Sequence, residues 1–118
     1  MSGDAGPIRN VRWVGPDNKA VVVEAAGDID LHRSTTFQQG LLDVARGGPE
    51  RIVLDLAGVG YMDSSGVASL VKLLARVRRD GVDLKLAGLT PRVRSVFEIT
   101  RLDTVFDIHG STEEALQA

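Results

Sequence analysis

The chain has 118 residues, no cysteine and a formal net charge of −2, and 43% of its residues are hydrophobic. This length suits a single soluble domain with one core. The lack of cysteine excludes disulfides and Cys-based zinc sites, and the slightly acidic balance argues against a nucleic-acid binder. The start, MSGDAGPIRN, does not resemble a signal peptide, and the longest apolar runs are too short to insert into a membrane. We therefore expect a cytoplasmic protein.

The chain begins with small and polar residues. Residues 1–7 are expected to form a disordered N-terminal tail, which leaves residues 8–118 as the domain. Residues 8–14 alternate loosely between apolar and polar, and residues 20–26 form a β-branched run. The turn-forming run GPDN lies between them, so they are expected to form a hairpin. The first of these strands is expected to lie at the sheet edge, and residues 28–30 are expected to close the second.

The rest of the chain alternates between helix and strand. Helices are indicated where apolar residues recur on one helical face, as at Val67, Leu70, Val71, Leu74 and Val77. Thr90-Pro91 and Ser111 are expected to cap two further helix starts. The expected helices after the hairpin are 33–46, one that follows residue 63 and ends before Gly81, one that starts at Pro91, and a terminal one after Ser111. The expected strands between them are 51–56, 83–87 and 105–108.

This order predicts an α/β fold. A strand–helix–strand rhythm requires right-handed crossovers and a mostly parallel sheet. The opening hairpin adds an antiparallel member, so the sheet is expected to be small and mixed. About four helices are expected to cover mainly one of its faces.

The segment YMDSSGVASL raises the question of function because Ser64 and Ser65 follow Asp63 where a strand gives way to a helix. Capping of the helix by serine is the simplest interpretation. A second interpretation is a regulated hydroxyl. A phosphate at a helix N-terminus meets unpaired N–H groups and the positive end of the dipole, so the fold tolerates it while the docking surface changes.

Catalytic and nucleotide sites are poorly supported. Ser64 and Ser65 lack the G-x-S-x-G pattern of a nucleophile elbow, and the only candidate bases are His32 and His109. The run from Gly58 to Asp63 resembles G-x-G-x-x-G, but an aspartate replaces the third glycine, where a carboxylate opposes a bound pyrophosphate.

A metal site is the remaining alternative. Asp28, Asp30 and Asp63 lie at strand ends that a parallel sheet brings to one edge. Two or three carboxylates can hold Mg²⁺, although such sites usually also use substrate phosphates. A solvated acidic edge is the favoured interpretation, and the sequence predicts no metal, cofactor or catalytic residue.

Two long stretches resemble a known family. IVLDLAGVGYMDSSGVASLVKLLARVRRDG and DLKLAGLTPRVRSVFEITRLDTVFDIHGSTEEAL, together with GDID at residues 27–30, are similar to STAS domains of the anti-sigma factor antagonist kind. The most specific part is MDSSGV, residues 62–67, in which Val67 stands where leucine is common. The resemblance runs from about residue 8 to residue 116 and agrees with the predicted order of elements.

The resemblance implies a switching mechanism. In this family the serine after the motif aspartate, here Ser64, is phosphorylated by an anti-sigma factor that is also a serine kinase. The unphosphorylated antagonist binds that kinase and releases the sigma factor, and a PP2C-type phosphatase reverses the modification. By the same resemblance Asp30, Asp63, Ser64 and Ser65 contact the kinase, which supplies ATP and Mg²⁺. This chain is then a binding protein and not an enzyme.

Other members of this family suggest an alternative. Some STAS domains are constitutive subunits of transport ATPases or belong to stress-signalling assemblies. The sequence leaves these roles open.

Overall fold

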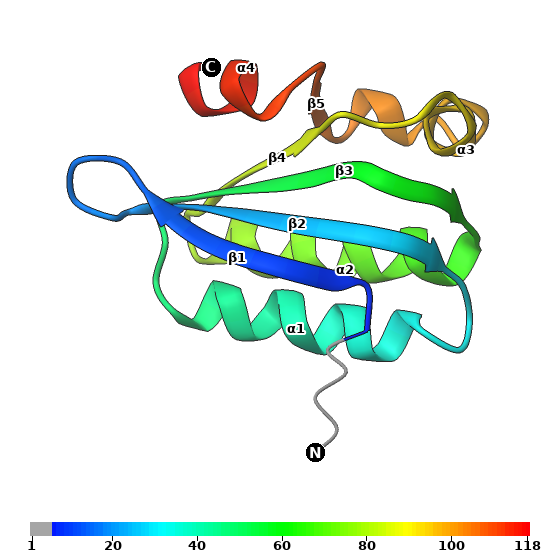
Figure 1. Cartoon of the computed structure of the whole chain (residues 1–118), viewed down its shortest axis with the longest axis horizontal. Helices are drawn as coiled ribbons and strands as arrows, with labels where there is room; N and C mark the ends of the chain where they lie inside the picture. The colour runs from blue at the N-terminus through cyan, green and yellow to red at the C-terminus, as the bar shows by residue number, and fades with distance from the viewer. Residues whose placement is uncertain (1–5) are drawn as a thin grey trace.

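The computed structural model describes residues 6–118 and forms a five-stranded sheet in the order β1-β2-β3-β4-β5 (Figure 1). β1 and β2 are antiparallel, and the remaining neighbours are parallel. The predicted α/β class, the mixed sheet and the opening hairpin are confirmed. The strands are β1 (Ile8–Val14), β2 (Ala20–Ile29), β3 (Arg51–Met62), β4 (Asp83–Ala87) and β5 (Asp107–His109). The helices are α1 (Ser34–Arg46), α2 (Ser64–Arg79), α3 (Pro91–Ile99) and α4 (Thr112–Gln117), with a 3₁₀ turn at Leu102–Thr104.

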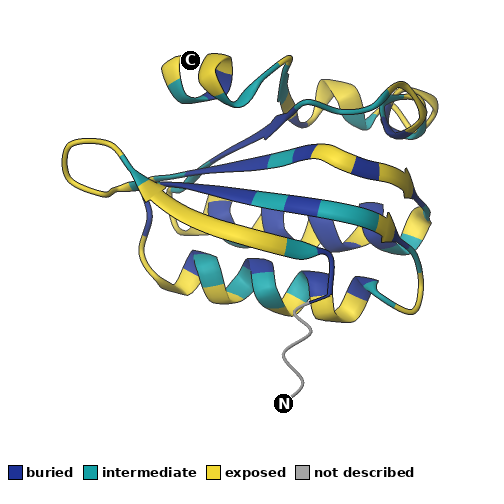
Figure 2. Cartoon of the chain, viewed as in Figure 1, coloured by how far each residue is buried: buried dark blue, intermediate teal, exposed yellow. Residues whose placement is uncertain are grey.

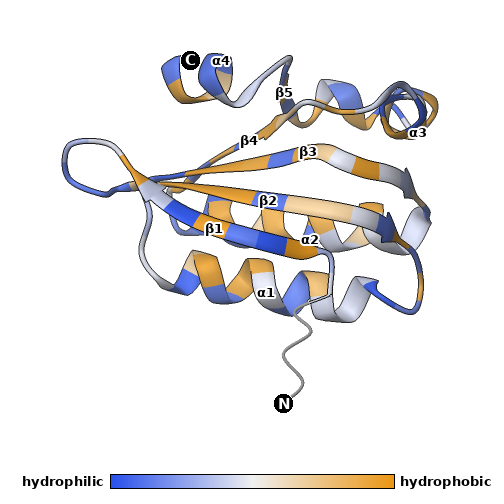
Figure 3. Ribbon diagram, in the orientation of Figure 1, coloured by the Kyte–Doolittle hydropathy of each residue, from blue (hydrophilic) through white to orange (hydrophobic). Residues whose placement is uncertain are grey.

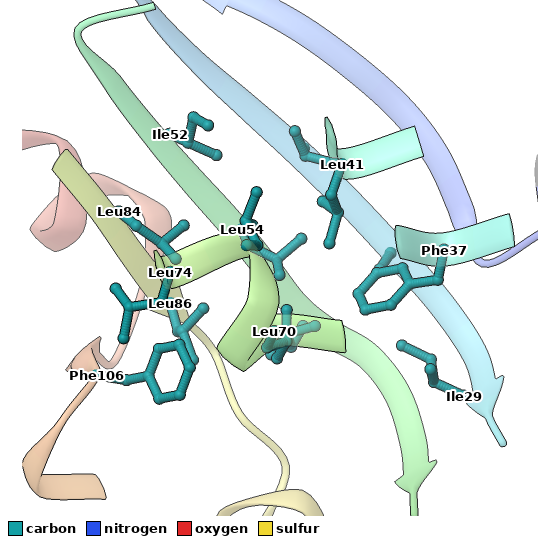
Figure 4. Packing of buried hydrophobic residues seen from close by; sticks show 14 of the residues in the cluster. Ile29, Phe37, Leu41, Ile52, Leu54, Leu70, Leu74, Leu84, Leu86 and Phe106 are labelled. Carbon is teal, nitrogen blue, oxygen red and sulfur yellow. The ribbon is translucent and has the colours of Figure 1, made fainter. Parts of the chain in front are cut away.

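The main core lies between the sheet and the two long helices. Apolar side chains dominate β2, β3 and the inner faces of α1 and α2 (Figure 3). Phe37 and Leu41 of α1 and Leu70 of α2 meet Ile52 and Leu54 of β3 in this layer, and all five are fully buried (Figure 4). Burying an aliphatic or aromatic side chain of this size contributes about 1.5–3 kcal/mol. The burial of this layer therefore fixes both helices against the sheet.

The opposite face of the sheet is only partly covered. Ala115 of the short helix α4 packs there against Val22, Val53 and Ala87. The expectation that helices lie mainly on one face therefore holds for α1 and α2, whereas α4 departs from it (Figure 1). Sequence periodicity could not place α4, because a six-residue helix presents too short an apolar face.

β1 lies at the edge of the sheet, as expected, and most of it is exposed (Figure 2). The tail predicted to be disordered falls mostly outside the described residues. Its last two residues, Gly6 and Pro7, are described and buried, and the Pro7 carbonyl accepts a hydrogen bond from the Ala26 N–H at 2.9 Å. This bond continues the contact between the two strands of the hairpin beyond the pair Ile8–Ala25.

Two strand boundaries differ from the prediction. β3 runs to Met62 instead of ending at Leu56, because its second half pairs with residues 26–29 of β2 through two register shifts. Gly58 permits this pairing, since a Cβ there would lie 3.0 Å from the Ala25 carbonyl oxygen. The last strand begins at Asp107 and not at residue 105, because the preceding segment forms the 3₁₀ turn.

α2 differs from the prediction at one position. Val67, Leu70, Leu74 and Val77 are buried as expected, but Val71 is 41% exposed.

No helix within residues 6–118 has the length and apolar character needed to cross a bilayer.

Candidate functional site

The parallel pairing of β2 and β3 brings the MDSSGV motif beside the GDID segment. Ile29 at the end of β2 is the partner of Met62 at the end of β3, and the Asp63 N–H donates to the Ile29 carbonyl at 3.2 Å. Asp30 and Asp63, which immediately follow these strands, therefore lie at the same edge of the sheet. The structure thus brings together the two motifs, whose aspartates Asp30 and Asp63 are 33 residues apart in the sequence.

Asp63, and not a serine, caps α2. Its backbone is extended, and its Oδ1 accepts hydrogen bonds from the backbone N–H of Ser65 at 2.9 Å and of Gly66 at 3.3 Å. The interpretation of Ser64 or Ser65 as the cap is therefore wrong, since they occupy the first and second helical positions. Aspartate and serine cap helices about equally well, so the sequence alone did not place the boundary.

The side chain of Ser65 is hydrogen-bonded to Asp63. Its Oγ donates to Asp63 Oδ1 at 2.5 Å, which makes this one oxygen the acceptor for three groups. The Ser65 hydroxyl is the largest cause that lowers the pKa of Asp63, and the N–H groups of Gly66, Ser65 and Leu31 lower it further, while burial opposes them. Asp63 is therefore ionised at neutral pH, and its charge is already engaged within the protein.

Ser64 differs from its neighbour. Its side chain is exposed, and its hydroxyl makes no hydrogen bond to the part of the chain that the structure describes. Its backbone stands at the first position of a 16-residue helix. An accessible hydroxyl at a helix N-terminus can accept a phosphate without disturbing the core, because the helix end favours negative charge.

Asp30 shapes the loop between β2 and α1. Its Oδ1 accepts the backbone N–H of His32 at 3.0 Å and of Arg33 at 3.2 Å. This turn presents the side chain of Leu31, which is 71% exposed, and the pKa of Asp63 is lowered in part by the Leu31 N–H. We call residues Asp30, Leu31, Asp63, Ser64 and Ser65 the Ser64 rim.

Two exposed side chains at this end of the sheet were missed from the sequence. Leu31 has no counterpart in the sequence interpretation, because its exposure depends on the Asp30 turn and not on periodicity. Tyr61, at the end of β3, is 37% exposed, and the guanidinium of Arg92 lies 5.4 Å from the centre of its ring. A lone tyrosine before the motif aspartate was the only sequence signal for this contact.

Gly66 holds the helix start close to the sheet. A Cβ at this position would lie 2.7 Å from Met62 Cγ and 2.8 Å from Ile29 Cγ2. These separations are too short for any side chain, so α2 can start directly on the ends of β2 and β3 only with glycine here. The close approach keeps Asp63, Ser64 and Ser65 in one fixed arrangement.

The catalytic and metal alternatives find no support in this geometry. Neither His32 nor His109 is hydrogen-bonded to Ser64 or Ser65 within residues 6–118, and Nε2 of His109 lies 3.0 Å from Asp107 Oδ1 instead. Among the same residues no three His, Asp or Glu side chains are grouped as metal ligands. Asp28, Asp30 and Asp63 thus share an edge of the sheet without forming such a cluster.

Comparison with known proteins agrees with the fold and with the resemblance to STAS domains. The STAS domain family matches residues 14–115. The anti-sigma-B factor antagonist of Bacillus subtilis is 32% identical over 97 residues, which cover 82% of this chain and 88% of the relative.

Two solved structures share the fold. An anti-sigma factor antagonist from Thermotoga maritima, described as putative, superposes with a TM-score of 0.84 at 21% identity, covering 92% of this chain and 91% of that one. SpoIIAA of Bacillus, solved in its phosphorylated form, has a TM-score of 0.69 at 21% identity over 92% of this chain and 96% of that one. The extent of the family match and the identity to the Bacillus subtilis protein establish that this chain belongs to the STAS domain family.

Proposed function

We propose that this protein is an anti-sigma factor antagonist whose binding is switched by phosphorylation of Ser64. The observation that carries the proposal is the difference between the two serines of the motif. Ser65 is bound to Asp63, whereas Ser64 is exposed at the start of α2 without a hydrogen bond to residues 6–118. The names of the relatives support the same role.

The Ser64 rim provides the binding surface in this proposal. Asp30 and Asp63 supply negative charge, Leu31 supplies an apolar contact, and Ser64 lies among them. Phosphorylation adds a charge of about −1.5 to −2 beside two carboxylates. A partner surface that fits the unmodified rim then faces either a like charge or a phosphate that it cannot pair. Like-charge contacts at an interface are costly, so the complex dissociates.

The partner proteins catalyse the phosphorylation and dephosphorylation of Ser64. Ser64 is a substrate, so the chain needs no catalytic base of its own and acts as a binding protein. An anti-sigma factor with serine kinase activity supplies ATP and Mg²⁺, and a PP2C-type phosphatase restores the hydroxyl. All three proteins meet in the cytoplasm.

Binding to the cognate anti-sigma factor tests the proposal. We expect Ser64→Ala to bind with nearly wild-type affinity and Ser64→Asp to bind at least about tenfold more weakly, a loss of about 1.4 kcal/mol. Gln39→Glu, which adds the same charge on the exposed side of α1, is the matched control and should bind like wild type. If Ser64→Asp and Gln39→Glu bind equally well, phosphorylation of Ser64 is not the switch.

Leu31 tests the extent of the same surface. Leu31→Ala removes a side chain that is 71% exposed, so we expect the free energy of unfolding to change by less than about 0.5 kcal/mol. Affinity for the partner should fall about fivefold or more, because the variant buries less apolar surface when the complex forms. Unchanged affinity would place Leu31 outside the interface.

A further inference from the structure

Two arginine side chains from different elements converge beside the loop between β2 and α1. An ideal Cβ on Gly27 would lie 3.7 Å from Nη2 of Arg9 and 3.8 Å from Nη2 of Arg33. The two Nη2 atoms are therefore no more than about 7.5 Å apart, the sum of these distances. Two positive charges this close repel each other, and an anion bound between them would relieve this repulsion.

Within residues 6–118 neither guanidinium forms an ion pair with a carboxylate. Asp30 is nearby in sequence, but its Oδ1 accepts the backbone N–H groups of His32 and Arg33. Asp28, next to Gly27, is exposed and likewise unpaired in this part of the chain. Among the carboxylates that the structure describes, none is ion-paired with either arginine.

Arg33 carries a second sign of a missing partner. Its Nε is buried and has no hydrogen-bond acceptor among the described residues. Buried donors are nearly always satisfied, and a charged donor that is not needs an explanation such as a bound ion. Arg33 also stands at the N-cap position, where α1 begins, and its side chain makes no capping hydrogen bond.

The backbone beside this pair of side chains is irregular at two positions, Arg9 and Gly27. Ile8 pairs with Ala25 and Asn10 with Glu24, so Arg9 is the extra residue of a β-bulge. Bulges often redirect a side chain near a functional site. The Arg9 guanidinium is also fixed by a hydrogen bond from Nη1 to the Gly6 carbonyl at 2.7 Å. Gly27 itself has φ +85°, a conformation that favours glycine, and leaves the space between the two guanidinium groups without a side chain of its own.

We propose that Arg9 and Arg33 form a phosphate-binding site over Gly27. Two phosphate oxygens, each accepting at about 2.8 Å, span about 8 Å between donor nitrogens, which covers the separation of the two Nη2 atoms. A dianion matches two guanidinium charges better than a single carboxylate does. The phosphate is either inorganic phosphate or a phosphate monoester. Ser64 is not part of this site, so the proposal does not depend on the switch described above.

Titration of the ¹⁵N-labelled full chain with inorganic phosphate tests this site, with sodium chloride at equal ionic strength as the reference. We expect saturable shifts of the Gly27 amide and of the Arg33 Nε–H signal. Arg33→Gln and Arg9→Gln should each weaken binding about tenfold, because each removes one charge-assisted contact. Arg79→Gln, which removes an exposed arginine at the end of α2, is the matched control and should bind like wild type.

The remaining outcomes are equally defined. O-phosphoserine is titrated beside inorganic phosphate, and whichever binds more tightly identifies the form of the ligand. Acetate should bind more weakly than either; equal binding of acetate would overturn the assignment to phosphate. A response that does not saturate, or that is the same in Arg9→Gln as in wild type, would overturn the site itself. Arg9 lies on the exposed edge strand, so this variant tests the site even if Arg33→Gln fails to fold.

Discussion

Replacement of Asp63 by alanine should destabilise the protein through the start of α2. Three donors lose their acceptor, namely the N–H groups of Ser65 and Gly66 and the hydroxyl of Ser65. Loss of an N-cap costs about 1 kcal/mol. The bond from the Ser65 hydroxyl to a charged acceptor adds about 1 kcal/mol once the partial exposure of Asp63 is allowed for. We therefore expect Asp63→Ala to lower the free energy of unfolding by about 2 kcal/mol.

Replacement of Asp63 by asparagine keeps the helix cap but removes the negative charge. Asn caps helices about as well as Asp, so Asp63→Asn should cost only about 0.5–1 kcal/mol at pH 7. The pKa of Asp63 is lowered in the folded protein, so its charge stabilises the fold above the usual pKa range of aspartate, and this stability is lost as the pH falls through the lowered pKa. The difference between wild type and Asp63→Asn should therefore shrink on acidification from pH 7 to about pH 3.

Urea denaturation followed by circular dichroism at both pH values measures these differences. For a chain of 118 residues, 1 kcal/mol corresponds to about 4 °C in Tm, so Asp63→Ala should melt about 8 °C lower than wild type. Asp17→Ala, at an exposed aspartate of the β1–β2 turn, is the control. Equal losses for Asp63→Ala and Asp63→Asn at pH 7, or a loss below about 0.5 kcal/mol for Asp63→Ala, would refute the capping role assigned to this carboxylate.

Three further changes have defined outcomes. Ser65→Ala should cost about 1 kcal/mol and Ser64→Ala almost nothing, and equal melting temperatures would contradict the different environments of the two hydroxyls. Gly66→Ala should destabilise by about 2 kcal/mol or more, because its Cβ would lie 2.7 Å from Met62 Cγ; chemical denaturation measures the loss, and a neutral effect would show that the helix start can move. The pKa of Asp107 is lowered first by its hydrogen bond from Lys85. Asp107→Asn should therefore cost about 1 kcal/mol at pH 7 and progressively less towards pH 3, and a cost independent of pH would argue against this ion pair.

The alternation of strands and helices could be predicted from the sequence because apolar periodicity follows the element type. Two helix starts were also predicted correctly. The Thr90 hydroxyl accepts the Val93 N–H, and the Ser111 hydroxyl accepts the Glu114 N–H. At Thr90 the following proline marked the start of the helix, and at Ser111 the glutamate three residues later did so.

Features that depend on tertiary contacts were harder to predict. At the start of α2 an aspartate and two serines compete as caps, so local preference could not choose among them. The second half of β3 is rich in glycine, which is typical of a loop, yet pairing with β2 makes it a strand. The exposure of Leu31 depends on the Asp30 turn, and the approach of Arg9 to Arg33 depends on a bulge in β1.

Phosphosite mapping of the protein isolated from its own cells, under stress and without stress, tests the central claim most directly. The account predicts a single phosphate on Ser64 whose occupancy differs between the two conditions, with Ser65 unmodified. A chain that carries no phosphate in either condition, or carries it on another residue, would contradict the switch and would favour a constitutive STAS subunit of a transport ATPase or of a stress-signalling assembly.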